Sequence, residues 1–252
     1  MTTSAVTGRV LVVDDQDYAQ VPLVSALGPV VDWCPNIGQL KRRIDNGETW
    51  RAAFIDFFLG IGEPCGLNAM MLLRRATPDI RLVSFTTFGD GGGRTLFAAA
   101  ANHWYNAVFV NKGNLDPSIV RRAADPTDNP TDSRLRQQLR HAHLVDALFV
   151  EPSWLPIWQA WPRFDGSQAA IVTALGPTYT PAVVRGFAQR AITAVERFEA
   201  AFAASDPVSK PARGNRAQAA PLARFAAENR VFFSAPDLGH VLSDVNPGGH
   251  RH

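Results

Sequence analysis

The stretch Arg9-Val10-Leu11-Val12-Val13-Asp14-Asp15 decides the fold of this chain. Its four consecutive aliphatic residues predict a strand that is buried on both faces, which is typical of a parallel sheet. Two carboxylates, Asp14 and Asp15, follow at the point where this strand ends. Ligands of open α/β sheets bind beyond the carboxyl ends of the strands, and a hard cation such as Mg²⁺ would relieve the repulsion between adjacent carboxylates. Taken alone, the pair fits equally well a solvated turn, or a helix cap at Asp15.

Three further apolar runs, at residues 51–56, 82–87 and 107–112, also end in polar side chains. These side chains are a carboxylate, a hydroxyl and an ammonium: Asp56, Thr86 and Lys112. Helix-like segments separate the runs, so we expect parallel strands whose ends meet at one edge of a sheet. At such an edge, two carboxylates can hold a metal ion and a third can act as a nucleophile. The hydroxyl and the ammonium can then contact the oxygens of a transferred phosphoryl group.

The segment from Arg9 to Ala124 resembles the receiver domain of bacterial two-component response regulators. The resemblance depends on five matched positions at four strand ends: Asp14, Asp15, Asp56, Thr86 and Lys112. It implies a flavodoxin-like, doubly wound, parallel five-stranded sheet. It also implies that a sensor histidine kinase phosphorylates Asp56, and that Asp14, Asp15 and Asp56 hold Mg²⁺.

The segment has one further match to the family pattern and several departures from it. Phe109, three residues before Lys112, matches the aromatic switch position of the family, although an ordinary core phenylalanine is an equal alternative. The loop at residues 57–66 is longer than is usual in the family, and residues 87–93 form an extended, glycine-rich loop. Gly113 stands where proline is common. These departures leave the carboxylates intact but affect the usual switching surface.

The composition fits a globular protein of two domains. The chain has 252 residues, of which 46% are hydrophobic, and a formal net charge of only +2. This charge gives no general attraction to polyanions. The two cysteines form no disulfide framework, Met1–Gly8 has no signal-peptide pattern, and no apolar run approaches the ~20 residues of a membrane span. We therefore expect a cytoplasmic protein without a membrane partner.

A segment rich in Pro, Asp, Asn and Thr, residues 125–133, predicts a linker after the receiver domain. We expect four parts. They are a receiver domain over 1–124, a linker with a helix over 125–160, an all-α helix–turn–helix output domain over 161–204, and a flexible C-terminal tail with a possible helix over 205–252. Trp154, Trp158 and Trp161 recur at helical spacing, which favours core or interdomain packing over a ligand platform.

The apolar pattern of residues 164–202 predicts three helices, over 167–175, 181–188 and 191–203, with Thr180 as the N-cap of the second and Pro181 at its first position. Their spacing resembles the output domain of NarL/LuxR-type response regulators. That resemblance implies that the last of the three is a recognition helix, and that an active homodimer binds DNA. The DNA-binding residues we expect are Arg190, Thr193 and Arg197.

These features predict a non-enzymatic response regulator that controls transcription through DNA. Cations are few in the helical segment, and Glu196 lies on the expected recognition helix, where it would repel phosphates. The alternative is therefore an atypical regulator whose C-terminal helices bind a protein partner. A stand-alone phosphatase or hydrolase would need a further acid–base residue near Asp56, and none stands out in the sequence.

Overall fold

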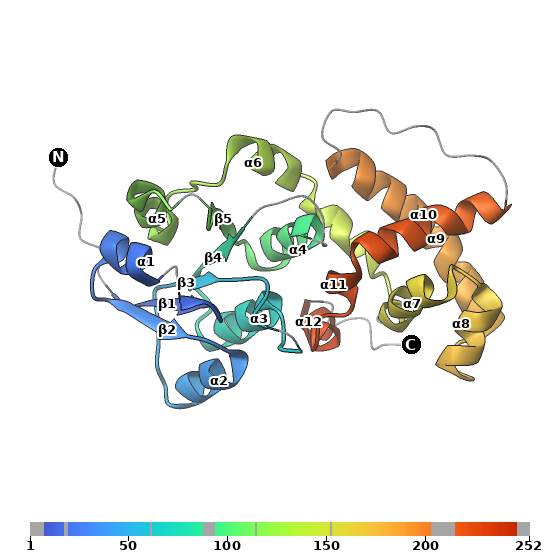
Figure 1. Ribbon diagram of the computed structural model, residues 1–252, viewed down its shortest axis with the longest axis horizontal. Helices are drawn as coiled ribbons and strands as arrows, with labels where there is room; N and C mark the ends of the chain where they lie inside the picture. The colour runs from blue at the N-terminus through green and yellow to red at the C-terminus, as the bar shows by residue number, and fades with distance from the viewer. Residues whose placement is uncertain are drawn as a thin grey trace.

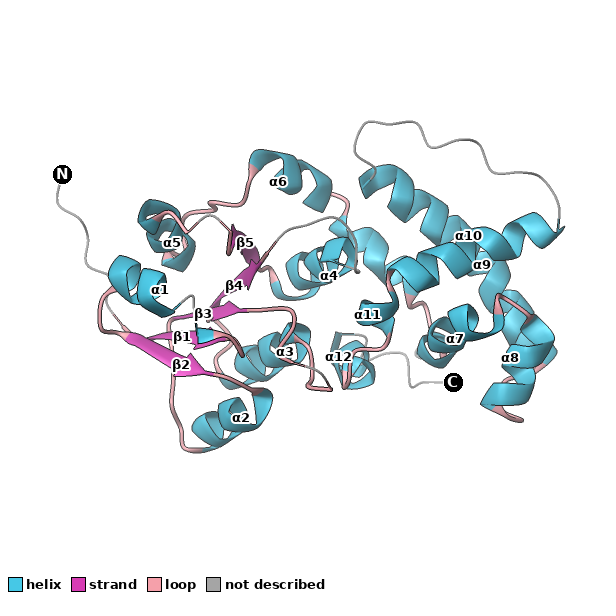
Figure 2. Ribbon diagram, viewed as in Figure 1, coloured by secondary structure: helices cyan, strands magenta, loops and turns pink. Residues whose placement is uncertain are grey.

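A computed structural model describes residues 8–17, 20–60, 62–87, 94–113, 115–151, 153–202 and 215–245. A parallel sheet lies at one end of the molecule, and helices make up the rest (Figures 1 and 2). The strands are β1 (Val10–Val13), β2 (Val31–Cys34), β3 (Ala52–Ile55), β4 (Arg81–Thr86) and β5 (Val108–Asn111). The glycine-rich loop at 88–93 and the last seven residues, 246–252, lie outside the described residues.

The sheet has the order β2-β1-β3-β4-β5, and every neighbouring pair is parallel. This is the strand order of flavodoxin-like folds. The expected five-stranded, parallel α/β sheet is therefore confirmed.

Helices cover both faces of the sheet, as the run of aliphatic residues in β1 requires. Val10 and Val12 face α1 and α5, whereas Leu11 and Val13 belong to the core on the opposite face, where α2, α3 and α4 pack. All four β1 residues are buried. The helices are α1 (Gln20–Leu27), α2 (Ile37–Asp45), α3 (Gly66–Ala76), α4 (Arg94–Tyr105) and α5 (Pro117–Ala124).

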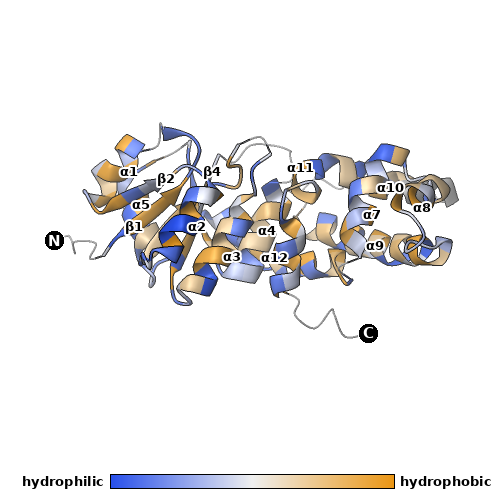
Figure 3. Cartoon of the chain, turned by 90° about the horizontal axis from the view of Figure 1, so that it is seen from below, coloured by the Kyte–Doolittle hydropathy of each residue, from blue (hydrophilic) through white to orange (hydrophobic). Residues whose placement is uncertain are grey.

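A helical region follows the sheet and then returns to it. Its elements are α6 (Ser133–Leu139), the 3₁₀ helices η2 (Ala142–Leu148) and η3 (Trp161–Phe164), α7 (Trp154–Ala160), α8 (Gln168–Leu175), α9 (Pro181–Phe202), α10 (Asn215–Glu228), α11 (Arg230–Phe233) and α12 (Leu238–Val245). In Figure 1, α11 and α12 lie between the sheet and the α7–α10 helices, and Figure 3 shows α12 beside α3. One continuous apolar core joins the α3–α4 side of the sheet to this helical region.

Two expectations for the helical region are wrong. The helix expected to begin at Pro181 does begin there, but it does not end at Ala188. It continues through the helix predicted over 191–203 as one helix, α9, because neither Gln189 nor Arg190 breaks a helix. The predicted form of helix–turn–helix is therefore absent there, although α8 and α9 pack together across a five-residue connection, 176–180. The prediction of a flexible tail with a possible helix over 205–252 is right about the helix, because α10 and α11 form there. It is wrong about residues 238–245, which form α12, whose apolar side packs on α3.

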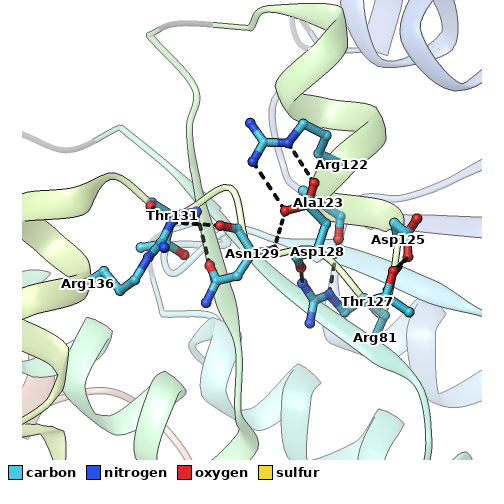
Figure 4. A network of polar contacts seen from close by, with 9 residues as sticks. All are labelled: Arg81, Arg122, Ala123, Asp125, Thr127, Asp128, Asn129, Thr131 and Arg136. Atoms are coloured by element: carbon cyan, nitrogen blue, oxygen red, sulfur yellow. Dashed lines mark hydrogen bonds and ion pairs between the residues drawn. The ribbon is translucent and has the colours of Figure 1, made fainter.

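Polar contacts hold the predicted linker, residues 125–133, to the sheet and to the helices on either side of it (Figure 4). The Arg81 guanidinium on β4 donates to the backbone oxygen of Asp128, and Arg136 donates to the backbone oxygen of Thr131 at 2.8 Å. The Thr131 hydroxyl accepts from the backbone N–H of Phe109 at 3.0 Å, which caps a donor on the edge strand β5. A segment of turn-forming composition is thus an ordered connection.

Among the residues that the structure describes, none of the helices has the length and apolar character of a membrane-spanning segment.

Gly66, the first residue of α3, is a position where only glycine fits. A Cβ there would overlap the backbone oxygen of Asp56, and would lie 2.9 Å from the carbonyl carbon of Asp56 and 3.1 Å from the Cα of Phe57. We expect Gly66→Ala to lower the free energy of unfolding by about 1–3 kcal/mol, since backbone must move to admit the methyl group. Denaturant unfolding followed by circular dichroism measures the change.

Gly186→Ala is the matched control, because Gly186 is inside α9 and a Cβ there would meet nothing within 4 Å. It should stabilise the protein by roughly 0.5–1 kcal/mol. Equal stability of Gly66→Ala and the wild type would contradict the close approach of α3 to the end of β3.

Candidate functional site

The register of the sheet brings the polar strand ends together. Val13 pairs with Ile55 across β1 and β3, so Asp14 and Asp56 are the next residues on adjacent strands. Thr86 ends β4, and the backbone N–H of Lys112 donates to the Thr86 oxygen at 3.0 Å as the chain leaves β5. The expected convergence of these groups on one edge of the sheet is confirmed.

Lys112 is the centre of this group. Its Nζ lies 2.6 Å from Oδ2 of Asp14 and forms a second ion pair and hydrogen bond with Oδ2 of Asp56. All three residues are buried. The ammonium therefore holds together the ends of strands that are far apart in sequence, and the expected proximity of Lys112 and Asp56 is confirmed.

Burial and charge act against each other at these groups. Burial raises the pKa of the Asp14 carboxyl, and the nearby Lys112 ammonium offsets that rise only in part. Burial also opposes the charged form of Lys112, but the carboxylates of Asp56 and Asp14 outweigh it, so the pKa of Lys112 is raised. Lys112 is thus firmly cationic, whereas the ionised form of Asp14 is costly to maintain.

Three carboxylates, Asp14, Asp15 and Asp56, form a group that can hold a metal ion. One oxygen of each lies within 4.8 Å of the others. Oδ1 of Asp56 is buried and accepts a hydrogen bond from none of the described residues. A buried carboxylate oxygen without a partner is costly, and a cation bound there would satisfy it. The donor set, all carboxylate oxygen, suits a hard divalent cation.

A cavity of about 640 Å³ opens beside this group. From the sheet edge it is lined by Asp15, Asp56, Thr86 and Lys112. Thr86 is buried, so its hydroxyl is a sheltered donor at the cavity wall. The cavity places a carboxylate, a hydroxyl and an ammonium around one space, which is an arrangement suited to accepting and stabilising a phosphoryl group.

Phe109 is not among the described residues that line the cavity. It is buried in β5, and its ring centroid is 6.5 Å from that of Phe57, the residue after Asp56. Both the switch and the core interpretation of Phe109 are compatible with this position.

The predicted DNA-binding residues lie on α9, away from the cavity. Arg190, Thr193 and Arg197 are exposed, and Val195 on the same helix is fully buried. The Arg190 guanidinium is already engaged, because it pairs with Glu151 at 2.6 Å and lies 5.0 Å above the Trp154 ring. Arg197 forms no ion pair with any described residue.

Three residues of the site were not found from the sequence. Gly66 allows α3 to approach Asp56, and its signal was its position in a glycine-containing loop after β3. Arg94 and Arg230 also line the cavity. Nothing in the sequence near Arg230 indicates this place, because only the return of the chain through α10 brings α11 to the sheet.

Lys112→Met should be destabilising at neutral pH, because it leaves two buried carboxylates without their counter-ion. We expect a loss of about 3 kcal/mol, and partial recovery in the double variant Asp14→Asn/Lys112→Met. Without Lys112, the pKa of Asp14 in the folded protein should lie still further above its value in the unfolded protein. The loss of stability should therefore shrink as the pH falls toward that pKa, because protonation removes the unpaired charge. Unfolding measured from pH 7 to pH 4 tests this, with exposed Lys41→Met as the control. A pH-independent loss would contradict the charge argument.

No model of a known protein family matches this chain, and no curated protein matches it either. The assignment of function therefore depends on the chemistry of the side chains at the sheet edge. That chemistry is a triplet of carboxylates, a buried ammonium and a buried hydroxyl beside one cavity.

Proposed function

We propose that this chain is a response regulator whose receiver part is phosphorylated on Asp56 by a sensor histidine kinase. The observation that carries the proposal is the position of Lys112, which contacts Asp14 and Asp56 beside a cavity lined by Asp15 and Thr86. A structural ion pair alone does not require a third carboxylate and a hydroxyl at the same edge. Phosphoryl transfer to a carboxylate uses each of them.

The residues perform the transfer as follows. An oxygen of Asp56 attacks the phosphorus of a phosphohistidine, the P–N bond breaks, and the departing imidazole nitrogen keeps the electron pair and takes up a proton. Lys112 has three donors, so its ammonium can hold Asp14 and also contact a phosphoryl oxygen. The Thr86 hydroxyl supplies a further donor from the cavity wall.

We propose Mg²⁺ as the cation held by Asp14, Asp15 and Asp56. Mg²⁺ binds through few protein carboxylates and keeps other positions for water or phosphoryl oxygens. When bound, it neutralises charge on the phosphoryl group during transfer. The buried Asp56 Oδ1, which accepts no hydrogen bond from the described residues, is a ligand atom ready for it.

Acetyl phosphate with Mg²⁺ should label the protein on Asp56. The adduct should be stable in acid and labile to hydroxylamine, as an acyl phosphate is, and chelation of Mg²⁺ should prevent it. Asp56→Asn should abolish labelling, whereas Asp45→Asn, an exposed carboxylate on α2, should label like wild type. Labelling of Asp56→Asn at the wild-type level would show that the phosphoacceptor is wrongly assigned.

For the output we propose control of transcription through DNA, with the exposed side of α9 as the contact and an active homodimer as the binding form. Arg185 and Arg197 support it, since both are exposed and neither forms an ion pair with a described residue. The alternative is a protein partner. The engagement of Arg190 by Glu151 and Trp154 favours that alternative, because it occupies one of the few cations available for phosphates.

Arg197→Ala in the phosphorylated full-length protein should weaken DNA binding and lower the salt slope by roughly one. Arg190→Ala should change the slope less, since its guanidinium is tied to Glu151. Arg42→Ala on α2 is the control. The full chain is needed because the helical region shares its core with the sheet. Selection of genomic DNA by the phosphorylated full-length protein provides a further test. If it enriches no sequence at low salt, the proposal of DNA binding is wrong and the alternative of a protein partner takes its place.

A further inference from the structure

The far wall of the cavity comes from the C-terminal part of the chain. Arg230, Val231 and Ser234 line it, together with Ala235 and Pro236. A segment that ends the described chain thus faces the carboxylate that we propose as phosphoacceptor. We call residues 230–245, which contain α11 and α12, the C-terminal cap.

The cap is held on the sheet side of the molecule by specific contacts. The Phe232 ring packs edge-on against Phe97 of α4, with centroids 4.8 Å apart. The Asp244 carboxylate of α12 pairs with Arg75 of α3 at 2.7 Å, and Leu242 is buried. These contacts hold the cap at the cavity, and the guanidinium of Arg230 takes part in none of them.

Two arginines, Arg94 and Arg230, line the cavity, and neither forms an ion pair with any described residue. Arg230 is exposed. Arg94 is the first residue of α4 and is partly buried, so its charge has lost part of its hydration. Carboxylates are close by in the same cavity, at Asp15, Asp56 and Glu63, yet none pairs with either arginine. The two cations are placed for an anion that enters the cavity.

We propose that Arg230, together with Arg94, binds the phosphoryl group on Asp56 and so makes the C-terminal cap responsive to phosphorylation. This inference rests on the proposed function. A phosphoryl group adds about −1.5 to −2 charge and three strong acceptor oxygens. The planar guanidinium matches two such oxygens at once, which an ammonium does not. Phosphorylation of Asp56 then draws α11 toward the sheet edge and holds the cap more firmly.

A continuous series of aromatic contacts leads from the cap to the helical region. Phe233, beside Phe232, stacks on Trp158 with centroids 4.8 Å apart, and Trp158 meets Phe187 of α9 at 4.9 Å. All of these rings are buried, and packed cores do not deform continuously. A firmer cap therefore restrains α9 through its buried face, to which Phe187 belongs.

Amide hydrogen exchange of residues 230–245 in the full-length protein tests the inference. Phosphorylation with acetyl phosphate and Mg²⁺ should slow exchange there about tenfold, the effect of one charge-assisted hydrogen bond. In Arg230→Ala the unmodified protein should exchange like wild type, because Arg230 pairs with no described residue, and phosphorylation should give no slowing. Arg230→Lys should give an intermediate effect.

Arg134→Ala is the matched control, an exposed arginine on α6 outside the cavity, and should behave like wild type. If labelled wild type shows unchanged exchange, or if labelled Arg230→Ala is slowed equally, the inference is overturned while Asp56 remains the phosphoacceptor. Faster exchange in unmodified Arg230→Ala would also overturn it, by showing a purely structural role. Absence of any label on wild type would overturn the proposed function and the inference together.

Discussion

The structure of the sheet edge depends on the contact of one buried ammonium, that of Lys112, with the buried carboxylates of Asp14 and Asp56. Lys112 follows β5, whereas Asp14 and Asp56 follow β1 and β3, so their meeting requires the correct register of four strands, β1, β3, β4 and β5. Removing one partner of a buried pair leaves a charge whose desolvation costs several kcal/mol. A slip of any of these strands would separate the charges and turn side chains to the wrong face. The ion contacts of the site therefore require the register of the sheet, and the register is in turn stabilised by these contacts.

The same edge carries a permanent imbalance of charge. Three carboxylates stand near one ammonium, and burial raises the pKa of Asp14 against its ionised form. Such an arrangement is poor for stability alone, and it persists because apolar cores on both faces of the sheet supply the stabilisation. Local conflict of this kind is expected where a protein keeps groups ready to bind a cation or an anion.

Aromatic packing makes the helical region part of the same body as the sheet. Phe97 of α4 contacts Phe57 next to the proposed phosphoacceptor at 5.2 Å, and Phe232 of α11 at 4.8 Å. From there the core continues through Phe233 and Trp158. Any change of charge at Asp56 is thus one side chain away from a ring that touches the C-terminal cap. This short path suits a regulator that transmits a local modification to a distant surface.

The sequence by itself determined the sheet and the identity of its edge. Runs of aliphatic residues ending in Asp14, Asp56 and Lys112 were sufficient, because burial on both faces and parallel crossover connections leave few arrangements for such runs. Local periodicity also located α8 and the buried tryptophans. Local periodicity wrongly predicted a break between two helices at Gln189 and Arg190, inside α9. Neither residue breaks a helix, and the packing of one face of α9 favours a continuous helix.

Only the tertiary structure decided what closes the cavity. Arg230 reaches the sheet edge because α10 returns the chain and because Phe232 and α12 find apolar partners on α4 and α3. Contacts between residues so distant in sequence leave no local pattern, since each is specified by the shape of two surfaces that exist only after folding. The carboxylates were therefore predictable from strand ends, whereas the arginines that face them were not.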